Sequence, residues 1–167
     1  MSVTFFETNC KESLRKEKQF GICDDQNGTK AYTDIINSAK WIAKVKNENE
    51  IDISFTAIDN CIIAYKEGSK DEESSCDGML TFAQSLYLIE LKKQGVGGWI
   101  SEAKGQLENT IRLISQNHDL SNFRYKKAFA CNRKHPNFTV IDTAERKSFF
   151  ERTKGFRIDV QAEIVIK

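Results

Sequence analysis

The chain has 167 residues, enough to bury a core without disulfides or metals, and we expect one domain over residues 1–167. With 40% hydrophobic and 29% charged residues and a net charge of +1, the composition is that of a soluble globular protein. No apolar run could span a membrane, and residues 1–7 lack the basic start and apolar run of a signal peptide. We therefore expect a cytoplasmic protein with no membrane partner.

The cysteines and histidines predict neither a disulfide framework nor a zinc site. The chain has five cysteines and no Cys-x-x-Cys pair, which predicts free thiols in a reducing compartment. Its two histidines, His118 and His135, lie in polar, loop-like stretches and are expected at the surface.

The first third of the chain predicts an extension, a helix and a broken strand. Residues 1–28 form a polar N-terminal extension, for which we predict loose packing and a short helix around 9–18. Apolar positions recur three or four residues apart over 30–46 and predict an amphipathic helix. Residues 53–65 predict an extended segment interrupted at Asp59 and Asn60. Asp59 is either an auxiliary acid of a nearby site or the hydrogen-bonding residue of a turn, and we favour the turn.

The stretch from Cys76 to Lys93 carries charges where buried strands should not have them. It predicts two apolar strands joined by a short turn near residues 83–85. Side chains alternate along a strand, so Glu90 and Lys92 share one face. If the two strands pair about the turn, Asp77 returns beside these two residues. Burying such charges costs several kcal/mol each unless a partner compensates, and a divalent cation is a common partner for two carboxylates.

Asp77, an apolar strand and then Glu90-Leu91-Lys92 together resemble the core motif of the PD-(D/E)XK nuclease superfamily. Cys76 stands where the motif has proline, a departure that is frequent in that superfamily. Two other Glu-x-Lys tripeptides, at 102–104 and 145–147, lie in polar, helix-like surroundings and predict ordinary solvated faces. The alternative for the first tripeptide is a buried ion pair at a strand end.

The resemblance implies a role for each residue of the motif. Asp77 and Glu90, with the backbone carbonyl of Leu91, would bind one or two Mg²⁺ or Mn²⁺ ions. Lys92 would position the attacking water or stabilise the charge that develops on the phosphate. Beside two acids its amine stays protonated, so we do not expect it to act as a base. Gln106 matches a glutamine on the helix after the catalytic strand that orients the site or holds the substrate, with solvent exposure as the alternative.

The last part of the chain predicts two crossover helices and further strands. The glycine-rich run at 93–98 predicts a flexible crossover, and residues 99–116 carry an apolar stripe that predicts a helix. Residues 125–132 predict a strand parallel to an earlier one, reached by a right-handed crossover. Asp142 predicts the N-cap of a helix that buries Phe149 and Phe150 and stops at residues 154–155, before a final strand or hairpin.

The small net charge conceals an asymmetry along the chain. Residues 1–90 hold 10 Lys and Arg against 16 Asp and Glu, a net charge of −6; residues 91–167 hold 15 against 8, a net charge of +7. A basic half beside a carboxylate site suits a polyanionic substrate, because phosphate contacts are electrostatic. Lys104, Arg133 and Lys134 are the predicted phosphate-binding residues, and a plain solvated surface is the alternative.

These elements predict an α/β fold. The resemblance implies a restriction-endonuclease-like core in αβββαβ order, with a mixed central sheet flanked by helices. We expect a Mg²⁺- or Mn²⁺-dependent nuclease that hydrolyses phosphodiester bonds, with DNA favoured over RNA. A bacterial defence or conflict system is the setting that this activity suggests, with a homodimer or a partner protein supplying specificity. The alternative is a catalytically inactive nuclease-fold binding module, such as an immunity protein or a partner subunit.

Overall fold

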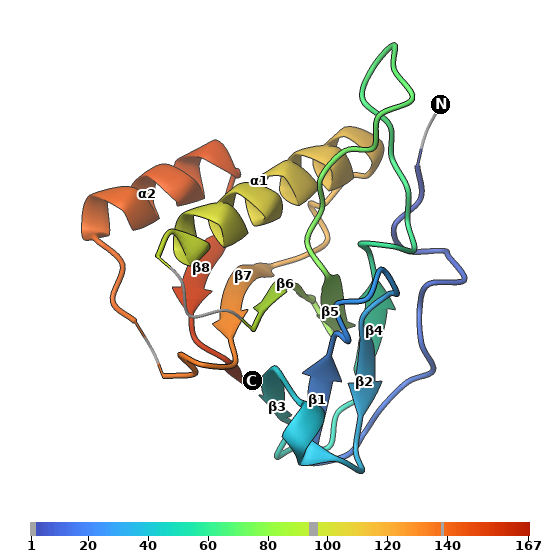
Figure 1. The fold of residues 1–167 in the computed structure, drawn as a ribbon, viewed down its shortest axis with the longest axis vertical. Coiled ribbons are helices and arrows are strands. Elements are labelled where there is room, and N and C mark those ends of the chain that lie inside the picture. The colour runs from blue at the N-terminus through green and yellow to red at the C-terminus, as the bar shows by residue number, and fades with distance from the viewer. Residues whose placement is uncertain (1–2, 94–96, 138) are drawn as a thin grey trace.

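Two sheets and two helices form three layers in the computed structural model, which describes residues 3–93, 97–137 and 139–167. Both helices cover one face of a five-stranded sheet, and a four-stranded sheet covers its other face (Figure 1). The α/β class with mixed sheets is confirmed. Both helices flank the mixed central sheet from the same face. No helix among the described residues combines the length and apolar character of a membrane span.

The five-stranded sheet contains the predicted hairpin. Its strands, in spatial order, are β4 (Ser54–Ala57), β5 (Gly78–Phe82), β6 (Ser85–Lys92), β7 (Tyr125–Asn132) and β8 (Arg157–Val160). β4, β5 and β6 pair antiparallel, whereas β6, β7 and β8 pair parallel. β6 is buried on both faces, which explains its almost continuous apolar run. The predicted turn, the strand at 125–132 and its parallel pairing are confirmed.

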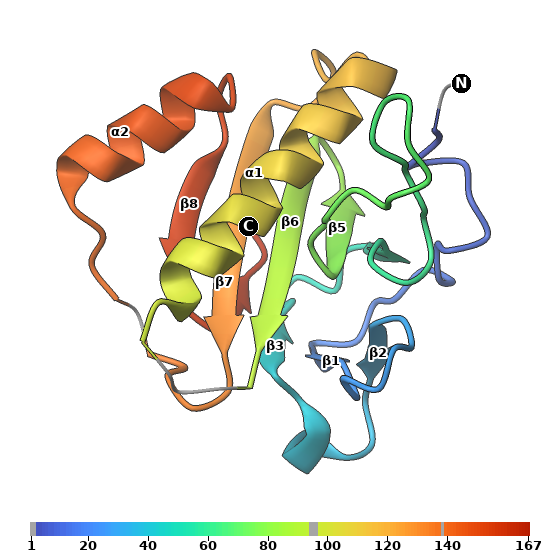
Figure 2. The same ribbon diagram turned by 45° about the horizontal axis from the view of Figure 1, so that its top comes forward.

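The helices α1 (Trp99–Asn117) and α2 (Thr143–Arg152) form the crossovers between the parallel strands (Figure 2). α1 buries Ala103, Leu107 and Ile111 in the cluster that also holds Leu86 and Leu88 of β6, so the helix predicted at 99–116 is confirmed. Residues 94–96 of the predicted glycine-rich crossover lie outside the described residues.

α2 follows Asp142 at the predicted N-cap position, but only one of its two phenylalanines is buried. Phe149 is fully buried, whereas Phe150 is 42% exposed. Successive side chains point about 100° apart around a helix, so the two rings cannot both face the sheet. The prediction for Phe150 is wrong.

The four-stranded sheet replaces the helix predicted at residues 30–46. Its order is β2 (Tyr32–Asp34), β1 (Gln19–Cys23), β3 (Ala43–Lys46) and β9 (Glu163–Val165), with a 3₁₀ turn, η1 (Ser38–Lys40), between β2 and β3. Asp34 explains the failure of the prediction. Its Oδ2 accepts hydrogen bonds from the backbone nitrogens of Ile36 and Asn37 and from the Trp41 indole nitrogen, which turns the chain where a helix would have continued. The αβββαβ order is therefore wrong at its first element.

The ends of the chain also pack differently from the prediction. β9 pairs parallel with β3 and lies in a different sheet from β8, so the two form no hairpin. Residues 9–18 are not helical: Arg15 exchanges backbone hydrogen bonds of 2.8 and 2.9 Å with Ile53. Phe5 and Phe20 are buried, so the loose packing predicted for residues 1–28 is wrong for the described residues 3–28. β4 is an edge strand whose backbone amides and carbonyls need hydrogen-bond partners, and the N-terminal segment supplies them. This pairing holds the segment against the sheet.

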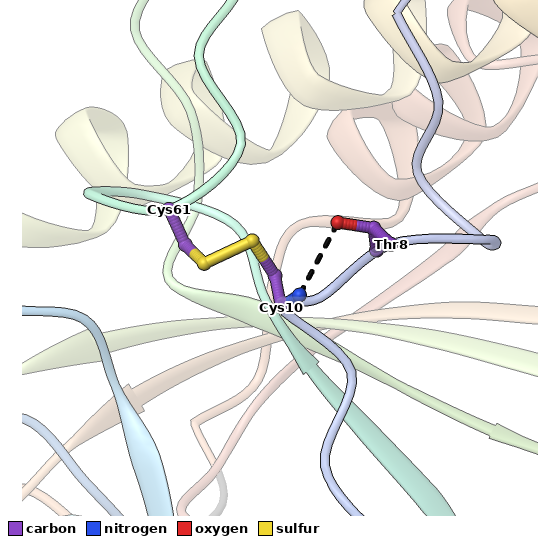
Figure 3. The surroundings of a disulfide bond; sticks show 3 residues. All are labelled: Thr8, Cys10 and Cys61. Carbon is purple, nitrogen blue, oxygen red and sulfur yellow. Dashed lines mark hydrogen bonds between the residues drawn. A yellow bond between two sulfur atoms is a disulfide. The ribbon is translucent and has the colours of Figure 1, made fainter.

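A disulfide joins this N-terminal segment to the turn that follows β4. Cys10 and Cys61 are bonded, with their Cα atoms 5.9 Å apart (Figure 3). The prediction of free thiols is wrong for this pair, since 51 residues of sequence separate two cysteines that the fold brings together. Cys23, Cys76 and Cys131 are free and buried. β4 ends at Ala57, and the backbone then turns through residues 58–62, which corrects the extended segment predicted to residue 65.

Candidate functional site

A hollow of about 320 Å³ lies where β6 ends and α1 begins. The loop after β1 and the turn after β4 form its other walls. Five carboxylates and two lysines line it: Asp24, Asp59, Asp77, Glu90, Glu102, Lys92 and Lys93. Gln106 also lines it, so the hollow brings Asp77, Glu90, Leu91, Lys92 and Gln106 together as expected. Asp59 lines it too, although the sequence favoured a turn role for this residue.

The register of the hairpin places Asp77 beside Glu90. Gly78 of β5 pairs with Ile89 of β6 in an antiparallel arrangement, so Asp77, one residue before Gly78, lies across from Glu90, one residue after Ile89. Asp77 Oδ2 accepts a hydrogen bond of 2.7 Å from the backbone nitrogen of Leu91. In a strand the N–H and C=O of one residue point to the same side, so the Leu91 carbonyl also faces this edge. Asp77 and Glu90 are only 6% and 3% exposed.

Glu90 is the least satisfied charge of the site. Its Oε2 lies 3.3 Å from the Lys92 amine, whereas its Oε1 is buried and has no hydrogen-bond partner among the described residues. Burial raises the pKa of Glu90 to about 7, against the opposing effect of Lys92. Burial and the charge of Glu90 also raise the pKa of Asp77 well above its usual range. Two close, buried carboxyls therefore resist being ionised together.

The Lys92 amine has three acceptors. It lies 2.8 Å from Glu102, 2.9 Å from Gln106 and 3.3 Å from Glu90. Burial alone would lower the pKa of Lys92, but the hydrogen bond to Glu102 and the charge of Glu90 outweigh it and leave the pKa raised. The amine is therefore a cation held between the strand and the helix.

Comparison of the chain with family models, curated proteins and solved structures gives no match. The interpretation of the site therefore depends on its own chemistry.

Two acids of the site were not identified from the sequence. Asp24 follows β1 and lies against the Asp77 carboxyl, and no local pattern links this loop to the hairpin. Glu102 was assigned to a solvated face, although it precedes Gln106 by one helical turn and so shares its side of α1. Asp59 also lies in the wall, where burial raises its pKa.

The three predicted phosphate-binding residues do not line the site. Lys104 lies 2.5 Å from Glu145 of α2. Arg133 donates to the carbonyl of Ala39 and lines a separate hollow, and Lys134 is exposed. The structure does not bring any of these described residues into the hollow that holds Asp77.

The donor set fits one divalent cation in part. Within residues 3–93, 97–137 and 139–167 no group of three His, Cys, Asp or Glu side chains is arranged to hold a metal. Asp77 and Glu90 supply two carboxylates, and the Leu91 carbonyl faces the same edge. Oxygen ligands of this kind suit Mg²⁺, which usually keeps several waters and needs only one or two protein carboxylates. The unpartnered Glu90 Oε1 is the atom that such an ion would satisfy.

Proposed function

We propose that this chain hydrolyses phosphodiester bonds in nucleic acid with Mg²⁺ or Mn²⁺ bound by Asp77 and Glu90. The observation that carries the proposal is the buried Glu90 Oε1, which has no hydrogen-bond partner among the described residues and lies beside a second buried carboxyl. Leaving such an oxygen unpaired costs free energy, and a cation would remove that cost. The proposal also includes the resemblance of the Asp77 and Glu90-Leu91-Lys92 motif to PD-(D/E)XK nucleases, from which the metal-binding roles are taken.

The arrangement of elements supports the same proposal. An antiparallel run β4–β5–β6 is followed by α1 and by β7 parallel to β6, the order that the resemblance implies after its first helix. Asp77 directly precedes β5, Glu90 lies on the neighbouring strand β6, and Gln106 lies on the helix that follows. The four-stranded sheet takes the place of that first helix.

Each residue of the site has a distinct role in the proposed mechanism. Asp77, Glu90 and the Leu91 carbonyl would hold the cation, which lowers the pKa of bound water and stabilises charge on the phosphate. Lys92, kept protonated by its acceptors, would hold the phosphate or orient the attacking water. Glu102 and Gln106 would position Lys92, since both accept from its amine.

Cleavage assays test the proposal directly. Purified protein would be incubated with plasmid, linear DNA and RNA in Mg²⁺, in Mn²⁺ and in chelator. We expect cleavage only with metal, and a loss of about 100-fold or more in Asp77→Asn and Glu90→Gln. Asp52→Asn is the matched control, because Asp52 lies at the surface 3.6 Å from Lys16 and is not among the described residues that line the hollow. Cleavage that persists in chelator, or that survives both substitutions, contradicts the proposal.

One observation favours the alternative of a catalytically inactive binding module. Lys92 already has three protein acceptors, as a structural ion cluster would provide. In that case Glu90 and Lys92 satisfy one another and need no metal. Calorimetry with Mn²⁺ separates the two functions: heat that disappears in Asp77→Ala supports the nuclease, and no heat in the parent protein supports the module.

A further inference from the structure

A basic groove with exposed aromatic rings lies at the end of the five-stranded sheet opposite the carboxylate site. Two adjoining hollows of about 440 and 390 Å³ share Phe150 and Arg157 in their walls. Arg124, Tyr125 and Lys126 line the larger hollow, and Arg146 lines the smaller. No carboxylate among the described residues lines either hollow.

The register of the strands separates this groove from the site. Tyr125 pairs with Ser85 at the start of β6, whereas Glu90 and Lys92 lie at its end. At about 3.3 Å per residue the two features are roughly 20 Å apart along the strand. The arrowheads of β6, β7 and β8 point the same way in Figure 2, so the starts of β7 and β8 lie together at the far end of the sheet.

The cations of the groove are largely free of carboxylate partners. Arg124, Lys126 and Arg157 have no Asp or Glu oxygen within 4.0 Å among the described residues, in contrast to Lys104 and Arg152, which pair with acids across the two helices. Lys127 and Arg146 share the single acid Asp159, at 3.6 and 3.8 Å. The groove thus carries more basic than acidic side chains, and three of its cations have no carboxylate partner among the described residues.

The aromatic side chains of the groove are arranged with the cations. Tyr125 is 52% exposed and Phe150 is 42% exposed, although large rings gain free energy by burial. The Arg124 guanidinium lies 5.5 Å from the centre of the Tyr125 ring, and that of Arg157 lies 5.7 Å from the centre of the Phe150 ring. Each pair therefore offers a flat surface and a positive charge together.

We propose that this groove binds single-stranded nucleic acid, with phosphates on the arginine and lysine side chains and unpaired bases stacked on Tyr125 and Phe150. Rings and guanidinium planes that face solvent beside free cations are the features that bind single strands without sequence preference. The bases of a duplex are stacked on one another and cannot use the rings. The inference deepens the proposed function, from which it takes nucleic acid as the ligand. Its test needs no metal.

Binding would be measured with the full chain in chelator, by fluorescence anisotropy with a labelled oligothymidine of about 20 nucleotides, longer than the sites of single binding folds. We expect the single strand to bind more tightly than a duplex of equal length. Tyr125→Ala and Phe150→Ala should each weaken binding of the single strand at least about fivefold. Tyr65→Ala is the matched control, because Tyr65 is 58% exposed and lies outside the groove; it should bind as the parent does.

The salt dependence of binding tests the role of the cations. Arg124→Gln and Arg157→Gln should each reduce the slope of log affinity against log salt by about 1. Arg157→Lys keeps the charge and should keep the slope, and Lys70→Gln, at an exposed position outside the groove, should leave the slope unchanged. Circular dichroism would verify that every variant is folded.

Two results would overturn the inference directly: no binding of the single strand at low salt, or equal affinity of Tyr125→Ala and Tyr65→Ala for it. A third would be a loss of affinity for inorganic polyphosphate in Tyr125→Ala as large as its loss of affinity for the oligonucleotide. The last result would make the groove a docking surface for acidic partners in general. The proposed nuclease is tested separately, because cleavage can fail while binding in chelator persists, and the reverse is equally measurable.

Discussion

The charge cluster at the end of β6 and the charge cluster between the two helices contain the same chemical groups in different surroundings. In the first, Lys92 lies 3.3 Å from Glu90, whose side chain is 3% exposed. In the second, Glu145 lies 2.5 Å from Lys104 and 3.3 Å from Arg152, and these side chains are 24–41% exposed. Water can solvate the second oxygen of Glu145, Oε2, whereas Glu90 Oε1 has neither exposure nor a partner among the described residues. Burial, and not the presence of an ion pair, distinguishes a candidate site from a solvated face.

Removing the lysine of the buried cluster should have the largest effect. Lys92→Met leaves the buried Glu90 without its cation, and breaking a buried pair in this way costs about 3–5 kcal/mol. We expect that loss in the free energy of unfolding above pH 7, measured by denaturant melts in chelator. A Lys92→Met variant as stable as the parent at pH 8 would show that the Lys92 amine does not stabilise the charge of Glu90.

The two clusters should respond to pH in opposite directions. The pKa of Glu90 in the folded protein is raised to about 7 from 4.5, so the folded state binds a proton that the unfolded state has released. Stability should therefore fall as pH rises from 4.5 to 7, by about 1.4 kcal/mol per pH unit for one proton. The pKa of Glu145 is lowered by hydrogen bonds from Lys104 and Arg152, so its contribution is present above pH 4.5 and is lost on acidification.

Melts of Glu90→Gln and Glu145→Gln from pH 4 to pH 8 would measure the two slopes. Glu90→Gln should remove the decline between pH 4.5 and 7, and Glu145→Gln should leave that decline intact. An unchanged decline in Glu90→Gln would assign it to another group, such as Asp77, whose pKa is raised by burial and by Glu90.

Weakening the exposed cluster should have the smallest effect. Arg152→Gln removes contacts of 2.6 Å with Glu108 and 3.3 Å with Glu145, but solvated pairs of this kind often contribute nothing measurable. We expect a melting temperature within experimental error of the parent value. A loss as large as that of Lys92→Met would remove the distinction between the clusters.

Local patterns were sufficient for the part of the fold that surrounds the site. The hairpin follows from the apolar runs on either side of residues 83–85, and the stripe of α1 follows from its spacing. Both signals act within about 20 residues, so neighbouring residues determine them. Asp77, Glu90 and Lys92 could be placed together for the same reason, whereas Gln106 was predicted only from the family resemblance.

The parts that failed depend on contacts distant in sequence. Residues 30–46 form no long helix because β3 pairs with β9, more than 100 residues later in the chain. Asp34 also stabilises a turn within the predicted helix. Asp24 reaches the site because the four-stranded sheet packs against the hairpin. Cys10 meets Cys61 because the N-terminal segment pairs with the edge of β4. No periodicity in the sequence records such pairings.

The stability of Glu90→Gln, with and without metal, tests most directly the claim that Asp77 and Glu90 exist to bind a cation. In chelator the variant should be as stable as the parent or slightly more stable, because the substitution removes one of two buried, mutually repelling carboxylates. In Mg²⁺ at about 100 times its dissociation constant the parent should gain about 2.7 kcal/mol, as Asp52→Asn should, and Glu90→Gln should gain little. A loss of about 3 kcal/mol or more by Glu90→Gln in chelator, or an equal gain from Mg²⁺ in both proteins, would contradict the claim and leave a structural ion cluster.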